Sequence, residues 1–302
     1  MSTAESPIDE DRAPPGSPLN VSWYPPGVPS ETRSSFRTRD GLALSTCHYP
    51  APTPRARVVL VHGYAEHVGR YPHVIEALNG AGYDCHALDL RGHGQSEGVR
   101  GHVLRFQDYL DDLDLFIAEL PQDGLPRFVV GHSLGGLLAL RYVLHRPEAF
   151  AALAVSSPYL NLATDVPWLQ EAVANAASHL APTLLTKSPI DAKALSHDPA
   201  VVEAYIADPL VFKTFNARWF FQVREAQEEI LKRAGEIRLP TLMLIGSADP
   251  IAQPGRSRQV FERLASSDKR LEVYDGFLHE VLNEVGRERV VRDLVEWLAV
   301  RG

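Results

Sequence analysis

Short apolar runs rich in β-formers alternate with stretches of helical periodicity along most of this 302-residue chain. Strands that alternate with helices pair in parallel, because each helix carries the chain back before the next strand begins. Two further runs flank Asp40-Gly41, a hairpin turn signal. The pattern predicts an α/β fold with a mostly parallel central sheet and helices on both faces. The expected strands are 34–39, 42–48, 57–62, 83–90, 128–131, 152–156, 241–245 and 270–274, and the expected helices are 71–78, 106–120, 134–145 and 288–300.

The alternation is interrupted once, between residues 158 and 238, where no convincing strand is found. A simple crossover needs only ~10–12 residues plus its loops, so this stretch is interpreted as an inserted helical cap. Ligand sites in open α/β sheets lie at the carboxyl ends of the strands, and a cap emerging there would cover the site. We therefore expect a core of residues 33–157 and 239–302 with a cap of residues 158–238. The Pro-rich segment 1–32 is expected to be a disordered tail.

Charge and composition exclude several classes of function. Thirty Lys and Arg against 38 Asp and Glu give a net charge of −8, which argues against nucleic acid or an anionic bilayer as the main partner. No run approaches the ~18 apolar residues of a membrane span, and no signal peptide is found, so a cytoplasmic protein is expected. Two cysteines, Cys47 and Cys85, are too few for a disulfide framework, and we expect both to be reduced and buried.

The segment Gly131-His132-Ser133-Leu134-Gly135 contains Gly-x-Ser-x-Gly between an expected strand and an expected helix. A serine hydroxyl is a poor nucleophile until a base removes its proton, and a sharp strand-to-helix turn would expose Ser133 to such a base. The glycines avoid a Cβ that would collide across the turn. The backbone N–H of Leu134, at the start of the helix, would face a developing oxyanion. A chance match is the alternative, but this context favours Ser133 as the nucleophile.

Candidates for the base and its acid partner follow Ser133 in the sequence. When a turn of this kind carries the nucleophile, the acid precedes the histidine along the chain. His279 follows the last expected strand and can reach Ser133, although a surface histidine is the alternative. Asp249 follows the strand 241–245 and can accept the Nδ1–H of His279, which would fix the tautomer. Asp275 is the rival carboxylate, but its closeness in sequence to His279 favours a turn or cap role.

A second oxyanion donor is expected in the loop His62-Gly63-Tyr64 after an early strand, where the backbone N–H of Tyr64 is the candidate. Glu66 and Arg70 are four residues apart and can pair on a helical turn, either bracing the loop or contacting substrate. The turn 91–96 is interpreted as scaffold under the site. Zinc binding by the histidines between 62 and 73 is disfavoured by their spacing. No metal or cofactor is expected.

Aromatic residues are concentrated in one part of the expected cap. Phe212, Phe215 and Trp219 share one face if this stretch is helical. They serve either as packing between cap and core or as an apolar wall for an acyl chain, which gains ~0.8 kcal/mol per buried methylene. Contact of the cap with membranes or micelles would be transient at most.

Together these motifs resemble the monoacylglycerol lipase and lysophospholipase group of the α/β-hydrolase superfamily, over roughly residues 33 to 300. The resemblance implies an α/β-hydrolase fold, a Ser133-Asp249-His279 triad, an oxyanion hole from the amides of Tyr64 and Leu134, and a cap-lined acyl tunnel. One departure is Tyr64, which is bulkier than the small residue of some members and is expected to narrow the entrance. The matching segments are His62-Gly63-x-x-Glu66-His67-x-x-Arg70-Tyr71, Asp89-x-Arg91-Gly92-His93-Gly94-x-Ser96-x-Gly98, Gly131-His132-Ser133-x-Gly135-Gly136, Leu195-Ser196-x-Asp198-Pro199 to Asp208-Pro209-Leu210-Val211, Asp249 and His279-Glu280.

The sequence therefore predicts a serine hydrolase that cleaves esters of single-chain lipids, most of all monoacylglycerols. A general carboxylesterase and a lysophospholipase are the nearest alternatives. A peptidase of the same superfamily and a binding protein on an inactive hydrolase scaffold are further ones. A neutral lipid ester gains nothing from a basic surface, so the net charge of −8 is compatible with this substrate.

Overall fold

The computed structural model describes residues 31–161, 175–176, 178–188 and 190–301. Eight strands form one sheet in the order β1-β2-β4-β3-β5-β6-β9-β10. The pairs β1–β2 and β2–β4 are antiparallel, and every other neighbouring pair is parallel. This confirms the predicted α/β class with a mostly parallel sheet. The strands are β1 (Thr32–Arg37), β2 (Ala43–Tyr49), β3 (Ala56–Val61), β4 (Tyr83–Leu88), β5 (Arg127–His132), β6 (Ala152–Ser156), β9 (Thr241–Gly246) and β10 (Lys269–Tyr274).

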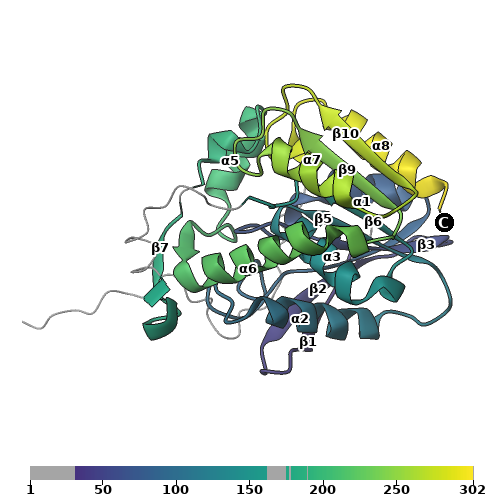
Figure 1. Cartoon of the computed structure of the whole chain (residues 1–302). Coiled ribbons are helices and arrows are strands. Elements are labelled where there is room, and N and C mark those ends of the chain that lie inside the picture. Colours follow the sequence, from purple (N-terminus) through teal and green to yellow (C-terminus); the bar gives the residue numbers. More distant parts are fainter. Residues whose placement is uncertain (1–30, 162–174, 177, 189, 302) are drawn as a thin grey trace, which may run out of the picture.

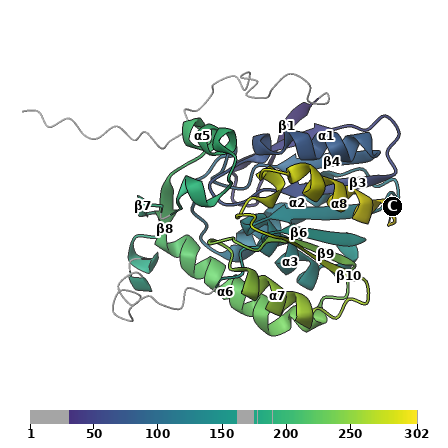
Figure 2. The same ribbon diagram turned by 90° about the horizontal axis from the view of Figure 1, so that it is seen from above.

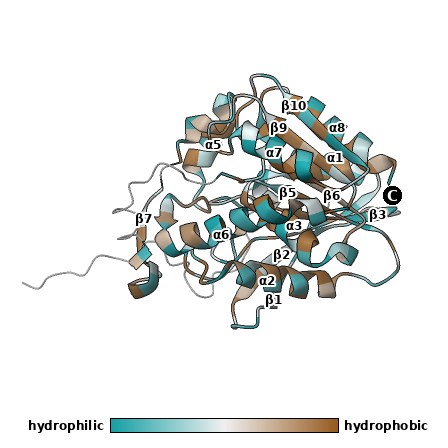
Figure 3. Ribbon diagram, in the orientation of Figure 1, coloured by the Kyte–Doolittle hydropathy of each residue, from teal (hydrophilic) through white to brown (hydrophobic). Residues whose placement is uncertain are grey.

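Helices cover both faces of this sheet (Figures 1 and 2). Apolar residues of α1 and α8 form the core on one face, and those of α2, α3, α6 and α7 form it on the other. Brown apolar and teal polar stretches alternate along these helices, as expected for amphipathic elements (Figure 3). The helices are α1 (Pro72–Gly80), α2 (Phe106–Glu119), α3 (Leu134–His145), α6 (Ala217–Arg233), α7 (Pro254–Arg263) and α8 (Arg287–Ala299).

Strand β3 shows why the central strands are rich in apolar residues: five of its six residues are apolar, and the exception is Arg57. Its side chains alternate between the two faces: Val58 and Leu60 pack in the core of α1 and α8, and Val59 and Val61 in the opposite core. All six residues of the strand are buried. Burying an aliphatic side chain contributes ~1.5–3 kcal/mol, so such a strand is stable only with helices on both sides. The parallel strands then end together at one edge of the sheet.

The segment between β6 and β9 differs in part from the sequence prediction. It contains α5 (Pro199–Ala207) but also two short strands, β7 (Leu185–Lys187) and β8 (Thr214–Asn216), which pair antiparallel. The helices α5 and α6 agree with the predicted helical character, but the two strands were not predicted, because three-residue strands leave no period in the sequence. In Figure 2, α5, β7 and β8 lie at one end of the sheet, beyond the strand ends. The later half of α6 packs into the core beside α3.

The two ends of the expected core differ in how far the structure describes them. Strand β1 begins at Thr32, one residue before the expected start of order, and residues 1–30 of the expected tail lie outside the described residues. Within the described residues, no helix is both long enough and apolar enough to cross a bilayer. Both cysteines are buried as free thiols.

Candidate active site

A strained turn between β5 and α3 presents Ser133. Its φ angle is +50°, a left-handed conformation that a residue with a side chain rarely adopts. A Cβ at Gly131 would overlap the backbone of Gly135, and a Cβ at Gly135 would overlap the carbonyl groups at the end of β3. The Ser133 amide donates to the carbonyl of Ser156 at 2.9 Å, which ties the turn to β6. The two glycines therefore allow the close contacts that the sequence pattern predicted.

Three side chains from the ends of three strands meet at this turn. The hydroxyl of Ser133 lies 2.9 Å from Nε2 of His279, which follows β10. Nδ1 of His279 lies 2.8 Å from a carboxylate oxygen of Asp249, which follows β9. The rival Asp275 instead accepts a hydrogen bond from the hydroxyl of Ser247, at 3.0 Å, in the turn between the strand ends. The arrangement provides a nucleophile, a base and an orienting carboxylate within hydrogen-bond reach.

The environment of Asp249 keeps its carboxylate charged. Burial alone would raise the pKa, but the hydrogen bond and charge of His279 and the amides of Ala252 and Ile251 lower it below the ordinary value. These amides donate at 2.9 and 2.7 Å. An ionised Asp249 accepts the Nδ1–H of His279, so Nε2 carries the lone pair that can take the proton of Ser133.

The loop after β3 lies close to the nucleophile. A Cβ at Gly63 would lie 3.3 Å from the Cβ of Ser133 and closer still to Glu66 and His132. Tyr64 follows directly. Leu134 is the first residue of α3, so its N–H has no carbonyl partner within its own helix. Both amides predicted to bind the oxyanion thus belong to backbone next to Ser133.

A buried ion-pair network joins this loop to the histidine loop. Arg70 donates to Glu66 at 2.7 Å and to both carboxylate oxygens of Glu280 at 2.6 and 2.8 Å. Glu66 also accepts from the amide of Gly63 at 2.5 Å and from the hydroxyl of Tyr71 at 2.6 Å. Burial opposes the charge of Glu66, but Arg70 together with His132, His62 and the Tyr71 hydroxyl outweighs burial, and the Glu66 pKa is lowered to about 2. The Glu66–Arg70 ion pair therefore braces the loop after β3, which was one of the two roles proposed from the sequence.

A pocket lies above Ser133 and is lined by residues from both the core and the region between β6 and β9. Of the five residues predicted to contact substrate, Glu66, Phe215 and Trp219 line it, and Arg70 and Phe212 do not. Arg70 is enclosed by its carboxylates, and Phe212 packs edge-on against Tyr64 at 5.2 Å. The described residues that line the pocket are Gly63, Tyr64, Glu66, His132, Ser133, Tyr159, Ile190, Leu195, Tyr205, Phe215, Trp219, Ile251, His279 and Glu280.

The aromatic residues of the cap region do not share a helical face. Phe212 precedes β8, Phe215 lies within it, and only Trp219 is in α6. The expected common face was wrong because β8 interrupts the helical spacing. Sequence analysis also missed Tyr159, Ile190, Tyr205 and Ile251, which come from four separate segments and share no motif.

The turn 91–96 packs beneath the site as predicted. Asp89, just before it, accepts from the amides of Val68 and Gln95, both at 2.9 Å. Arg91 pairs with Asp112 at 2.6 Å, which fixes the turn to α2. His62 bonds the carbonyl of Gly63 through Nδ1 and the amide of Leu90 through Nε2. These bonds occupy both ring nitrogens of His62, as expected for a structural rather than a zinc-binding histidine.

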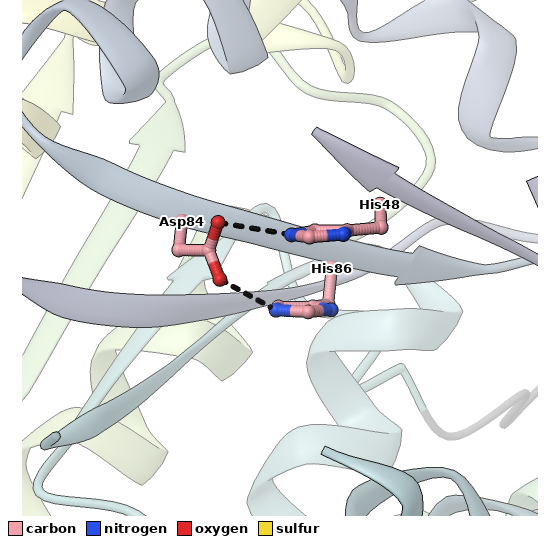
Figure 4. A group of neighbouring side chains, drawn as sticks. All are labelled: His48, Asp84 and His86. Carbon is pink, nitrogen blue, oxygen red and sulfur yellow. Dashed lines mark hydrogen bonds and ion pairs between the residues drawn. The ribbon is translucent and has the colours of Figure 1, made fainter. Parts of the chain in front are cut away.

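Among the described residues, His48, Asp84 and His86 form a group of metal-ligand types, at the opposite edge of the sheet from Ser133 (Figure 4). The two imidazole rings are stacked and nearly parallel, with centroids 4.3 Å apart. Each Nε2 faces a different oxygen of Asp84, at 2.9 and 3.0 Å, and Arg57 lies 3.6 Å from that carboxylate. Parallel rings do not direct both lone pairs at one ion, and Arg57 repels a cation. The group is a hydrogen-bonded clamp between β2 and β4.

Comparison with known proteins places the chain in a family. The family model that matches residues 52–286 is described as serine aminopeptidase, S33. A monoacylglycerol lipase from Mycolicibacterium smegmatis is 37% identical over 82% of this chain and 90% of its own. The human monoglyceride lipase is 30% identical over 92% of this chain and 93% of its own. The crystal structure of the Paleococcus ferrophilus monoacylglycerol lipase is 37% identical, with a TM-score of 0.78 over 86% of this chain and 99% of its own. The chain belongs to the monoacylglycerol lipase group of the α/β-hydrolase superfamily.

Proposed function

We propose that this protein hydrolyses monoacylglycerols through an acyl-enzyme on Ser133. The single observation that carries the proposal is the chain of contacts from Asp249 through His279 to Ser133, which ends at an apolar pocket. The lipase relatives support the same substrate class. The matching family model is described as a serine aminopeptidase. Whether the enzyme cleaves an ester or a peptide bond is therefore argued from the pocket.

The proposed reaction has two halves. The oxygen of Ser133 attacks the ester carbonyl while its proton moves to Nε2 of His279, and the amides of Tyr64 and Leu134 bind the oxyanion. His279 then gives that proton to the leaving glycerol oxygen, and the acyl group remains on Ser133. Water repeats the sequence: His279 takes its proton, the hydroxide oxygen bonds to the acyl carbon, and the fatty acid leaves as Ser133 regains its proton.

The pocket lining supports a neutral lipid ester over the alternatives. None of the described lining residues is Lys or Arg, so a lysophospholipid phosphate would find no positive partner there. The two lining carboxylates, Glu66 and Glu280, are both paired with Arg70, which leaves neither free for the amino group of a peptide. Tyr159, Phe215 and Trp219 supply apolar surface suited to an acyl chain.

We further propose that the region 158–238 acts as a cap that roofs the pocket and touches lipid aggregates transiently. Support comes from Tyr159, Tyr205 and Trp219, which this region contributes to the pocket. Leu180 and Ile206, from the same region, are 86% and 50% exposed. Exposed leucine and isoleucine side chains can insert among lipid chains. Stable binding to a membrane surface also draws on basic residues, so contact through these two side chains would be transient.

The test is a panel of substrates measured side by side: monoacylglycerols, lysophosphatidylcholine, p-nitrophenyl acetate and aminoacyl p-nitroanilides. We expect kcat/KM to be highest on a medium-chain monoacylglycerol. A higher kcat/KM on p-nitrophenyl acetate would indicate a general esterase instead. A higher value on the lysophospholipid or on the anilide would contradict the assignment outright.

A further inference from the structure

The side chain of Tyr64 reaches from the loop beside Ser133 to the cap region. Its hydroxyl lies 3.2 Å from the carbonyl of Thr214 in β8 and 3.4 Å from that of Gly101. Its ring packs on Trp219 with centroids 4.0 Å apart. These contacts hold one tyrosine between three separate segments of the chain, so its ring has little freedom to move.

Among the described residues, Gly101 and Phe212 pack directly behind the ring of Tyr64. Gly101 has a φ of +63°, and a Cβ there would overlap the Tyr64 hydroxyl and the ring of Phe212. Phe212 lies edge-on behind Tyr64 at 5.2 Å. Neither Gly101 nor Phe212 lines the pocket, whereas Tyr64 does. The ring of Tyr64 therefore forms one end wall of the pocket.

This end wall lies on the apolar side of the nucleophile. Tyr64 continues an aromatic surface that also includes Trp219, Phe215 and Tyr159. The ring centroids of Phe215 and Tyr159 lie 5.9 and 6.4 Å from that of Trp219. The polar lining residues, Glu66, Tyr205 and Glu280, are instead joined by Arg70, which lies 4.9 Å from the ring of Tyr205. An acyl chain follows the aromatic surface because contact with the polar group would leave charges unsolvated.

We propose that Tyr64 sets the upper limit of acyl-chain length, so that the enzyme accepts medium-chain monoacylglycerols and discriminates against long-chain ones. This rests on the proposed function and adds a specificity role for the side chain to the oxyanion role of its backbone. Each methylene that fits along the wall raises kcat/KM about fourfold, the equivalent of ~0.8 kcal/mol. Once the chain reaches the tethered ring, a further methylene has no apolar surface to occupy.

The test compares kcat/KM across monoacylglycerols from butanoyl to octadecanoyl for the wild type, Tyr64→Ala and Tyr64→Phe. The wild type is expected to peak at medium length. Tyr64→Ala should move the peak to longer chains and raise the octadecanoyl-to-octanoyl ratio at least about tenfold, as two or more extra methylenes at about fourfold each require. Tyr64→Phe keeps the ring but loses the tether to Thr214, so an intermediate shift is expected.

Tyr205→Ala is the matched control, since it removes the same volume from the polar side of the pocket and should leave the peak where it is. Fluorophosphonate labelling of Ser133 verifies that each variant is folded, and Tyr64→Leu replaces Tyr64→Ala if the latter does not label. A wild-type peak at octadecanoyl, an unchanged profile in the folded Tyr64 variant, or an equal shift in Tyr205→Ala would overturn the proposal. A wild type inactive on every monoacylglycerol would instead refute the proposed function.

Discussion

Arg70 lies between two buried carboxylates, and its replacement tests how far this network holds the two sides of the site together. The side chains of Glu66 and Glu280 are each 3% exposed, and that of Arg70 is 10% exposed. Arg70→Met keeps most of the apolar stem but leaves both carboxylates without their cation. Removing one partner from a buried ion pair costs ~3–5 kcal/mol, because the remaining charge stays buried and uncompensated. For a chain of this size we expect Tm to fall by about 10 °C.

The surface offers a matched control in Arg233, which also bridges two glutamates, Glu229 at 2.6 Å and Glu236 at 2.8 Å. Its side chain is 37% exposed, so water screens both pairs. Thermal unfolding of Arg70→Met and Arg233→Met should therefore give shifts that differ several-fold. Equal shifts in the two variants would refute the argument that burial makes the Arg70 network important.

The pH dependence of the Arg70 variant provides a second readout. In the wild type the pKa of Glu66 is lowered to about 2, so this carboxylate is ionised throughout the neutral range. Without Arg70 the burial of Glu66 is opposed only by His132, His62 and Tyr71. We therefore expect the pKa of Glu66 to rise above its value in the unfolded chain, so that the folded state binds protons more readily than the unfolded state. The deficit in stability relative to wild type should shrink as the pH falls from 7 to 5. A constant deficit would show that packing, not charge, was lost.

Three other substitutions test separate parts of the account. Asp249→Asn should lower kcat about 10⁴-fold with little change in Tm, since the amide cannot stabilise protonated His279; a loss below tenfold would contradict this. Burial, with the charge of His279, lowers the pKa of His132 from 6.5 to about 4. The folded state therefore gains ~3 kcal/mol of stability from neutral His132, and this gain is lost as the pH falls from 6.5 to 4. In His132→Asn the dependence of Tm on pH should be flatter over that range, and an unchanged slope would contradict this. Gly135→Ala should destabilise by at least ~1–3 kcal/mol through overlap with the end of β3, whereas Gly255→Ala, with open space around it, should not; equal effects would argue against the overlap.

The parts of the fold that the sequence predicted are those with a local physical signature. Central strands such as β3 are mostly apolar because both faces are covered, and Gly131 and Gly135 mark a turn that no larger residue fits. The positions of Asp249 and His279 followed from strand ends that share one edge of a parallel sheet. Their catalytic roles remain predictions until activity is measured.

The parts that could not be predicted depend on contacts between distant segments. Strands β7 and β8 are three residues each and pair with one another. Helix α7 has few apolar residues, so it leaves only a short apolar pattern in the sequence. The position of Phe212 behind Tyr64, and the pairing of Glu280 with Arg70 across 210 residues, leave no trace in local spacing.

The central claim is that Ser133 becomes covalently acylated, and active-site labelling tests it most directly. A fluorophosphonate should attach to one residue per chain, which peptide mass spectrometry should identify as Ser133. Hydrolysis of monoacylglycerol should fall in proportion to the labelled fraction, and Ser133→Ala should neither label nor hydrolyse. Full labelling at another residue, or hydrolysis by Ser133→Ala at the wild-type rate, would contradict the account.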